Sequence, residues 1–185
     1  MSTSSFGPSA LATPANAITM VRVLALPVVV LLIVGTDTRW QALAVWFVLA
    51  VSDLADGWLA RRQGATRSGA FLDPLADKVL VLGAMTALVA KGAMWWVPVT
   101  LIASREVAVS AYRSYVGRRG ISVPARMTGK VKTWIQAIAV GLAIAPLASD
   151  AYLASVDVVM WVAVALTLVT GVQFFHEGRQ VVREL

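Results

Sequence analysis

Long apolar stretches recur along this chain, and they constrain its fold more than any other feature. A helix needs roughly 20 mostly apolar residues to cross a bilayer. Six segments meet this requirement: Ala17–Gly35, Trp40–Leu59, Phe71–Ala90, Met94–Tyr115, Val131–Leu147 and Ala154–Phe174. Only 14% of the residues are charged, whereas soluble domains average about 25%. The sequence therefore predicts an all-α integral membrane protein with six transmembrane helices.

The basic residues predict how these helices cross the membrane. They gather near the first segment, in the second and fourth connections and at the C-terminus, namely Arg22, Arg61, Arg62, Arg67, Arg113, Arg118, Arg119, Arg126, Lys130, Lys132, Arg179 and Arg183. The odd-numbered connections hold only Arg39 and Lys91. Basic residues favour the cytoplasmic side, so we expect both termini in the cytoplasm. We expect residues 1–15 to form a flexible or interfacial tail, residues 16–178 the six-helix domain, and residues 179–185 a basic cytoplasmic tail.

Composition excludes several kinds of site. The chain has no cysteine, so it has neither disulfides nor thiolate metal sites. A single histidine, His176, makes a histidine-based triad or metal site implausible. The net charge of +6 comes from short basic clusters between apolar segments, which indicates anionic headgroups or phosphate-bearing substrates rather than nucleic acid. Trp95 and Trp96 fall at a predicted outer boundary, as in an aromatic belt.

Four aspartates stand where two predicted helices meet a short basic loop. Asp53 and Asp56 are three residues apart near the end of the second segment, and Asp73 and Asp77 are four apart near the start of the third. Each spacing places both side chains on one face of a helix. Because a short loop joins the two helices, we expect the four carboxylates to converge just inside the cytoplasmic boundary.

Carboxylates at membrane depth are costly and indicate a functional site. Oxygen ligands suit Mg²⁺ or Mn²⁺, and four carboxylates can hold two ions, as in sites for in-line displacement at phosphorus. Gly57 and Gly69 allow close approach of a ligand, Ala60 keeps the same face small, and Arg61 can bind a phosphate oxygen. Taken singly, Asp53 and Asp56 can be helix-end carboxylates, and Asp73 can be an N-cap with Pro74 in the first turn.

The pattern DxxDGxxAR…GxxxDxxxD, which these residues form, resembles the signature of the CDP-alcohol phosphatidyltransferase family. Seven residues separate Arg61 from Gly69, where the family more usually has eight. The resemblance implies six membrane helices, a homodimer, and a CDP-linked lipid bound across two divalent ions. It implies that the metal ligands are Asp53, Asp56, Asp73 and Asp77, that Asp77 is also the general base, and that the CDP site comprises Asp53, Asp56, Gly57, Ala60, Arg61 and Gly69.

The acceptor of the transferred group has to be sought in the fourth and fifth segments. Arg105 lies inside an apolar segment and needs a partner. Pairing with Glu106 looks unfavourable because adjacent helical residues point in different directions, so Asp53, Asp56 or a bound phosphate is the expected partner. Together with Arg113, Lys130 and Lys132, Arg105 predicts a cationic pocket for an acceptor that carries a phosphate. Thr19 and Arg22 either reach the substrates or serve as helix cap and interfacial anchor.

One branch of the family, the phosphatidylglycerophosphate synthases, resembles this region as well. The similar stretches are Asn16–Arg22, Phe71–Lys78, Ser104–Glu106, Tyr112–Arg113 and Gly129–Thr133. This resemblance implies CDP-diacylglycerol as donor, glycerol 3-phosphate as acceptor, and a bacterial inner (plasma) membrane location. Other acceptors within the family (inositol phosphate, serine or phosphatidylglycerol) stay open. A divalent-cation transporter or a structural subunit is a more remote alternative, and no internal repeat supports a transporter.

Overall fold

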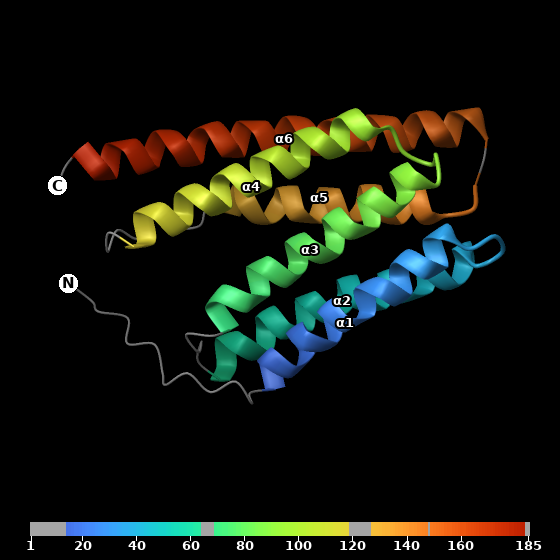
Figure 1. The fold of residues 1–185 in the computed structure, drawn as a ribbon, viewed down its shortest axis with the longest axis horizontal. Helices are drawn as coiled ribbons and strands as arrows, with labels where there is room; N and C mark the ends of the chain where they lie inside the picture. The colour runs from blue at the N-terminus through green and yellow to red at the C-terminus, as the bar shows by residue number, and fades with distance from the viewer. Residues whose placement is uncertain (1–13, 64–68, 119–126, 148, 184–185) are drawn as a thin grey trace. The chain divides into compact units, whose positions relative to one another are not determined.

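The computed structural model describes residues 14–63, 69–118, 127–147 and 149–183, and the side chains of 20–52, 76, 78–117, 131–147 and 149–178. Within these ranges the chain forms six helices and no strand (Figure 1): α1 Pro14–Val34, α2 Arg39–Gln63, α3 Gly69–Ala90, α4 Trp96–Arg118, α5 Met127–Ile144 and α6 Asp150–Arg183. Each predicted segment overlaps one helix. The all-α prediction with six helices is confirmed.

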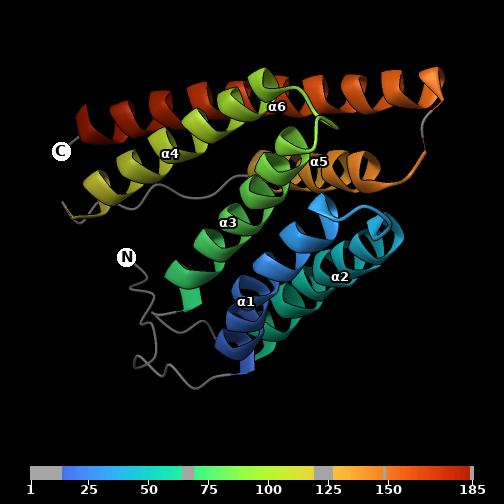
Figure 2. The same cartoon turned by 45° about the vertical axis from the view of Figure 1, so that its right-hand side comes forward.

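The helices form two compact units, which are described separately. Unit 1 contains the described residues of 1–91 together with Ile144–Pro146, and unit 2 contains those of 92–143 and of 147–185. In unit 1, α1 packs against both α2 and α3 (Figure 2). Val29 of α1 and Met85 and Leu88 of α3 are fully buried. Leu26 lies against Gly83, where an added Cβ would come within 2.6 Å of Leu26 Cδ1. Glycine at this position therefore lets α1 and α3 approach closely.

Three helix termini share one end of unit 1. Both ribbon views show the start of α1, the end of α2 and the start of α3 at this end (Figures 1 and 2). The two halves of the aspartate motif belong to the end of α2 and the start of α3. The topology of unit 1 thus brings both halves of the motif to the same end of the unit.

In unit 2, α4 and α6 run side by side in the same direction (Figures 1 and 2). Their register is visible in two glycines of α6 that lie against long side chains of α4. Gly171 lies against Arg105, and seven residues later Gly178 lies against Tyr112, which itself follows Arg105 by seven. Seven residues are about two helical turns, so the two helices stay in register. Helix α5 joins this pair, because Gln136 Nε2 donates a hydrogen bond to Thr167 Oγ1 of α6 (2.8 Å).

Lys91 and Arg39, the two basic residues predicted to lie in the odd-numbered connections, bind the C-terminal ends of helices. Lys91 Nζ donates to the carbonyl oxygens of Val34 and Gly35 at the end of α1 (2.6 and 2.8 Å). Arg39 Nε donates to the Ile144 carbonyl (3.2 Å). Cations are stabilising at helix C-termini because the carbonyls there lack helical partners. These two positive charges therefore have a local structural role.

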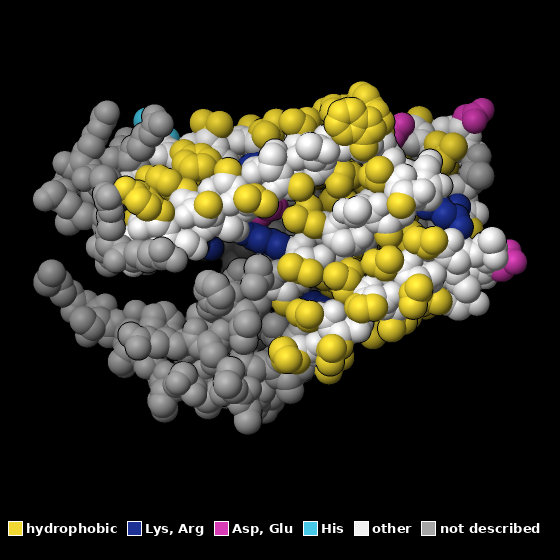
Figure 3. All heavy atoms as spheres, in the orientation of Figure 1, with side chains coloured by type: hydrophobic (Ala, Val, Ile, Leu, Met, Phe, Trp, Pro, Cys, Tyr) yellow, Lys and Arg dark blue, Asp and Glu magenta, His cyan; other side chains and the backbone are white. Residues whose placement is uncertain are grey.

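Apolar side chains remain exposed along whole helix faces. In α1, Leu24, Val28 and Leu31 are exposed, and Val158, Val162 and Val169 are exposed in α6. These positions repeat every three, four or seven residues, so each set forms one continuous stripe. In Figure 3 hydrophobic side chains gather over α1 and α3 in unit 1. Water-exposed patches of this kind are rare in soluble monomers, and the stripes indicate contact with lipid or with another apolar surface.

By length and hydropathy alone, one stretch among the described residues is suited to crossing a membrane, Asp150–Gly178 in α6. Shorter apolar stretches lie in α1, α2, α3 and α5: Met20–Val34, Arg39–Ser52, Lys78–Ala90 and Val131–Ile144. In α4 the apolar sequence is interrupted by Arg105, Glu106 and Arg113.

Candidate active site

The backbone of the aspartate motif is helical at all four acidic positions. Asp53 and Asp56 lie in α2, and Asp73 and Asp77 lie in α3. Gly57, Ala60 and Arg61 continue α2, and Gly69 is the first residue of α3. The helical spacing assumed for each acidic pair is therefore present. The side chains of these residues lie outside the described part of the structure, so the convergence of the carboxylates stays a prediction.

Asp73 is not a helix N-cap. The alternative interpretation placed it just before the third helix, with Pro74 in the first turn. Helix α3 instead begins at Gly69, so Asp73 lies a full turn inside it. An N-cap residue flanks the helix rather than belonging to its interior, and the capping interpretation is wrong.

Among the side chains that the structure describes, no group of three or more acidic or histidine residues can hold a metal ion. The four aspartates are not among them. The four aspartates supply carboxylate oxygens, which are the ligands that Mg²⁺ and Mn²⁺ prefer. The residues fit such an ion, and their positions at one end of unit 1 agree with a shared site.

The predicted acceptor-phosphate residues Arg105 and Lys132 meet in unit 2. One oxygen of Glu106, Oε1, accepts hydrogen bonds from Arg105 Nη1 (3.0 Å) and from Lys132 Nζ. The other terminal nitrogen of Arg105, Nη2, donates to Thr170 Oγ1 of α6 (3.1 Å). The side chains of Arg105, Glu106 and Lys132 are 10%, 5% and 8% exposed. Helices α4, α5 and α6 thus build a buried charged cluster, which we call the Arg105–Lys132 cluster.

The expectation that Arg105 and Glu106 would not pair is wrong. Adjacent Cβ atoms on a helix do diverge, but an arginine side chain is long enough to turn back toward its neighbour. Lys132 of α5 donates to the same oxygen of the Glu106 carboxylate. Burial makes the pair necessary, because an isolated charge away from water is costly. Among the described side chains, Arg105 therefore has Glu106 and Thr170 as partners. The expected contact with Asp53, Asp56 or a phosphate stays a prediction.

Arg113, two turns beyond Arg105, lies against an aromatic ring. Its guanidinium is 5.1 Å from the centroid of Phe174 of α6. Tyr112 packs on Phe174 and Phe175, with ring centroids 6.1 and 5.0 Å away. The planar guanidinium suits stacking on an aromatic face. Arg113 is exposed and available to a ligand. Lys130 belongs to α5, and its side chain lies outside the described residues.

Arg22 is a buried residue whose role the sequence left open. This residue of α1 is 2% exposed. Interfacial anchors extend their charged ends toward water, so burial disfavours the anchoring interpretation. The side chain of Thr19, its neighbour in α1, lies outside the described residues.

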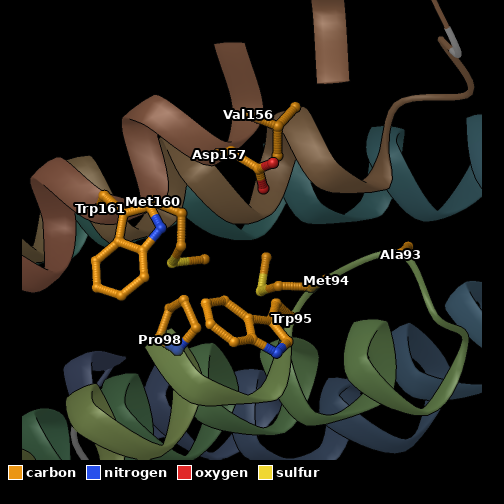
Figure 4. A pocket seen from close by; sticks show the side chains of 8 residues that line it. All are labelled: Ala93, Met94, Trp95, Pro98, Val156, Asp157, Met160 and Trp161. Atoms are coloured by element: carbon orange, nitrogen blue, oxygen red, sulfur yellow. The ribbon is translucent and has the colours of Figure 1, made fainter. Parts of the chain in front are cut away.

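A separate cavity of about 380 Å³ lies in unit 2, at the starts of α4 and α6 (Figure 4). Trp95 and Trp161 meet edge to face, with centroids 6.1 Å apart. The lining is formed by Ala93, Met94, Trp95, Pro98, Val156, Asp157, Met160 and Trp161. In Figure 4 the residues of α6 project toward Met94 and Trp95. The cavity contains none of the predicted site residues, so it is distinct from the candidate active site.

Comparison with known proteins gives a consistent result. The sequence profile of the CDP-alcohol phosphatidyltransferase family matches residues 12–169. A probable phosphatidylglycerophosphate synthase of Mycobacterium tuberculosis is 42% identical over 91% of this chain and 82% of its own length. The CDP-diacylglycerol–glycerol-3-phosphate 3-phosphatidyltransferase of Rickettsia typhi is 34% identical over 86% of this chain and 93% of its own length. An Escherichia coli protein of the same name is 41% identical over 66% and 71%.

The profile match covers most of the chain, including the aspartate motif at the end of α2 and the start of α3, and Arg105, Glu106 and Lys132. This chain belongs to the CDP-alcohol phosphatidyltransferase family.

Proposed function

We propose that this chain transfers a phosphatidyl group from CDP-diacylglycerol to glycerol 3-phosphate, forming phosphatidylglycerophosphate and CMP. The observation that carries the proposal is the aspartate motif, whose halves lie at the end of α2 and the start of α3. The names of the relatives at 34–42% identity support this donor and this acceptor. The buried arginine and lysine of unit 2 support an acceptor that carries a phosphate.

In this proposal Asp53, Asp56, Asp73 and Asp77 hold two divalent ions, Mg²⁺ or Mn²⁺. When bound, such ions neutralise the pyrophosphate and stabilise the charge that develops during displacement. Gly57, Ala60, Arg61 and Gly69 form the CDP site with Asp53 and Asp56. The short side chains allow the nucleotide close to the helices, and Arg61 donates to its phosphate oxygens.

Asp77 is the general base. It accepts the proton from the acceptor hydroxyl as that oxygen bonds to the lipid-side phosphorus. The bond between this phosphorus and the oxygen of the cytidine-bearing phosphate breaks, and CMP leaves with the electron pair. Arg105, Arg113, Lys130 and Lys132 hold the phosphate of the acceptor, which keeps the hydroxyl oriented for attack.

We further propose that all six helices cross a bacterial inner (plasma) membrane, with both termini and the active site on the cytoplasmic side, and that the protein is a homodimer. The basic residues of the even connections support this orientation. The exposed apolar stripes of α1 and α6 support contact with lipid. Helices with polar residues in their spans, such as α4, are tolerated where those residues face the interior of a bundle, and Glu106 is 4% exposed.

The test is an acceptor panel with the purified protein in detergent, CDP-diacylglycerol and Mg²⁺ or Mn²⁺. We expect CMP release to depend on glycerol 3-phosphate and on the metal, with loss of activity after chelation. Inositol phosphate, serine and phosphatidylglycerol are the competing acceptors. Release of CMP with one of these, and not with glycerol 3-phosphate, would reject the assigned acceptor. Flux of divalent ions into proteoliposomes without CMP release would reject the enzyme assignment itself.

A further inference from the structure

The Arg105–Lys132 cluster contains residues that have no place in the mechanism above. Glu106 accepts hydrogen bonds from both cations, although a carboxylate is an unsuitable group for contacting a phosphate. Taken over the whole residue, Glu106 is 4% exposed and Lys132 is 7% exposed. A buried carboxylate is retained only where partners compensate its desolvation. Here the partners are two residues that the proposed function assigns to the acceptor phosphate.

Thr170 fixes the other side of Arg105. Its hydroxyl lies 2.7 Å from the Leu166 carbonyl, one turn earlier in α6. A hydroxyl has one hydrogen, and donation to Leu166 leaves its lone pairs free to accept from Arg105 Nη2 (3.1 Å). The guanidinium can only donate, so Thr170 is the acceptor of this hydrogen bond. Glu106 and Thr170 together hold the two terminal nitrogens of the guanidinium, which defines the plane of the fork.

Gly171 supplies the space in which Arg105 lies. A Cβ at this position would be 3.0 Å from Arg105 Nε and 3.1 Å from Arg105 Cγ. These distances are tighter than ordinary van der Waals contact, so the arginine would have to move by a few tenths of an ångström. Because its terminal nitrogens are held at 3.0 and 3.1 Å by Glu106 and Thr170, such a movement would loosen these bonds. Any side chain at position 171 is therefore coupled to the placement of the guanidinium.

We propose that Glu106, Thr170 and Gly171 are positioning residues, which hold Arg105 and Lys132 as a preformed pair of cations for the phosphate of the acceptor. This inference rests on the proposed function. The described residues occupy two of the five N–H groups of Arg105, so donors remain for a ligand. A fixed pair of donors binds an anion without the cost of ordering two long side chains at each encounter. Glu106, Thr170 and Gly171 thereby act mainly on the affinity for the acceptor.

The experiment compares the KM for glycerol 3-phosphate, the KM for CDP-diacylglycerol and kcat. The variants are Gly171→Ala, Thr170→Val and Glu106→Gln, measured with the metal-loaded full-length protein. We expect each to raise the KM for glycerol 3-phosphate by about tenfold to a hundredfold, the effect of losing one charge-assisted hydrogen bond. The KM for CDP-diacylglycerol and kcat should change by less than about threefold, since these residues do not position the donor or the base.

Two matched controls remove a merely structural explanation. Gly117 lies near the end of α4, also in unit 2, and an added Cβ there meets nothing within 4 Å. Thr100 is an exposed threonine of α4 whose hydroxyl bonds only to its own helix, at the Trp96 carbonyl. Gly117→Ala and Thr100→Val should leave the KM for glycerol 3-phosphate unchanged. A structural role would lower the yield or the Tm of the variants, but the folded enzyme would keep its KM.

Glu106→Gln removes a buried counter-charge and can prevent folding, so the decision rests on Gly171→Ala and Thr170→Val. If both fold and keep the wild-type KM for glycerol 3-phosphate, the inference is overturned while the proposed function stands. If the wild-type protein itself releases no CMP with glycerol 3-phosphate, the proposed function fails first, and the inference fails with it. A selective rise in the acceptor KM supports both.

Discussion

At the scale of single residues, burial disfavours an anchoring role for Arg22 and Glu106. Arg22 is 2% exposed and Glu106 4% exposed, whereas Arg113 is exposed and lies over Phe174. Charged residues that anchor a membrane protein extend toward water. Charged residues that are held inside a bundle mark functional sites. The burial of Arg105 and Glu106 in α4 therefore supports the proposed acceptor site.

The first prediction concerns the assigned base. Asp77→Asn keeps the size of the side chain but removes its negative charge, so the side chain cannot accept a proton and is a weaker metal ligand. A positioned general base contributes about 10²–10⁴-fold, so we expect kcat to fall by roughly this factor while the protein still folds. CMP release under saturating substrates measures the change.

Asp157→Asn is the matched control, because Asp157 is an exposed aspartate of the separate cavity in α6. It should keep normal turnover. Near-normal kcat in Asp77→Asn would remove Asp77 from the role of base.

At the scale of helices, small residues determine how closely the elements approach. Gly83 allows α1 to lie against α3 through Leu26, and Gly171 and Gly178 allow α6 to lie against the long side chains of α4. The chain also uses glycine where a helix ends, since Gly92 follows α3 with a positive φ of 71°. This left-handed conformation carries little cost only for glycine. Helix α6 starts after Ser149, whose hydroxyl accepts a hydrogen bond from the Tyr152 amide (3.3 Å), as N-cap residues do.

The second prediction tests the contact between α1 and α3. In Gly83→Val the new side chain would overlap Leu26, since even a Cβ would be 2.6 Å from Leu26 Cδ1. Overpacking of this kind costs about 1–3 kcal/mol. We expect a lower Tm in detergent, measured by the change in helical circular dichroism on heating. Gly117→Val is the control, because space is open around Gly117. An equal loss of Tm in both variants would contradict a close α1–α3 contact.

At the scale of the whole molecule, the sequence predicted the class and the number of elements well. All six helices overlap the predicted apolar segments, because apolar stretches long enough to span a bilayer have few alternatives to helix. The helix ends were less predictable. Helix α6 runs over 34 residues, to Arg183, although the apolar segment was placed at Ala154–Phe174. Its polar ends continue the helix, and Gly178 in the C-terminal end does not interrupt it, so this glycine does not mark a boundary.

The candidate site was predictable in its residue types and not in its pairings. The four aspartates follow a spacing that can be read from the sequence alone. The pairing of Arg105 with Glu106 and Thr170 requires the register of α4, α5 and α6, which no local pattern gives. The prediction against an Arg105–Glu106 pair was wrong because it compared only the directions of adjacent Cβ atoms. A long arginine side chain can still reach its neighbour. The contact of Gly171 with Arg105 depends on the same register and could not be predicted.

The third prediction concerns orientation in the membrane. The natural chain has no cysteine, so single cysteines can be labelled without background. Thr36→Cys lies in the first connection, and Gly117→Cys lies at the end of α4; both positions are exposed. We expect a membrane-impermeant maleimide to label Thr36→Cys from outside intact cells, and Gly117→Cys only in inverted vesicles. Labelling of both positions from the same side would contradict the proposed orientation.

The central claim is that aspartates from two helices hold divalent ions jointly, and equilibrium binding of Mn²⁺ to the purified protein tests it most directly. Asp56→Asn removes a carboxylate from α2, Asp73→Asn removes one from α3, and Asp37→Asn is an exposed control in the first connection. We expect the wild-type protein and the control to bind two ions, and both site variants to lose at least one of them or to bind about tenfold more weakly or worse. If either site variant binds Mn²⁺ with wild-type stoichiometry and affinity, the two helices do not share a metal site.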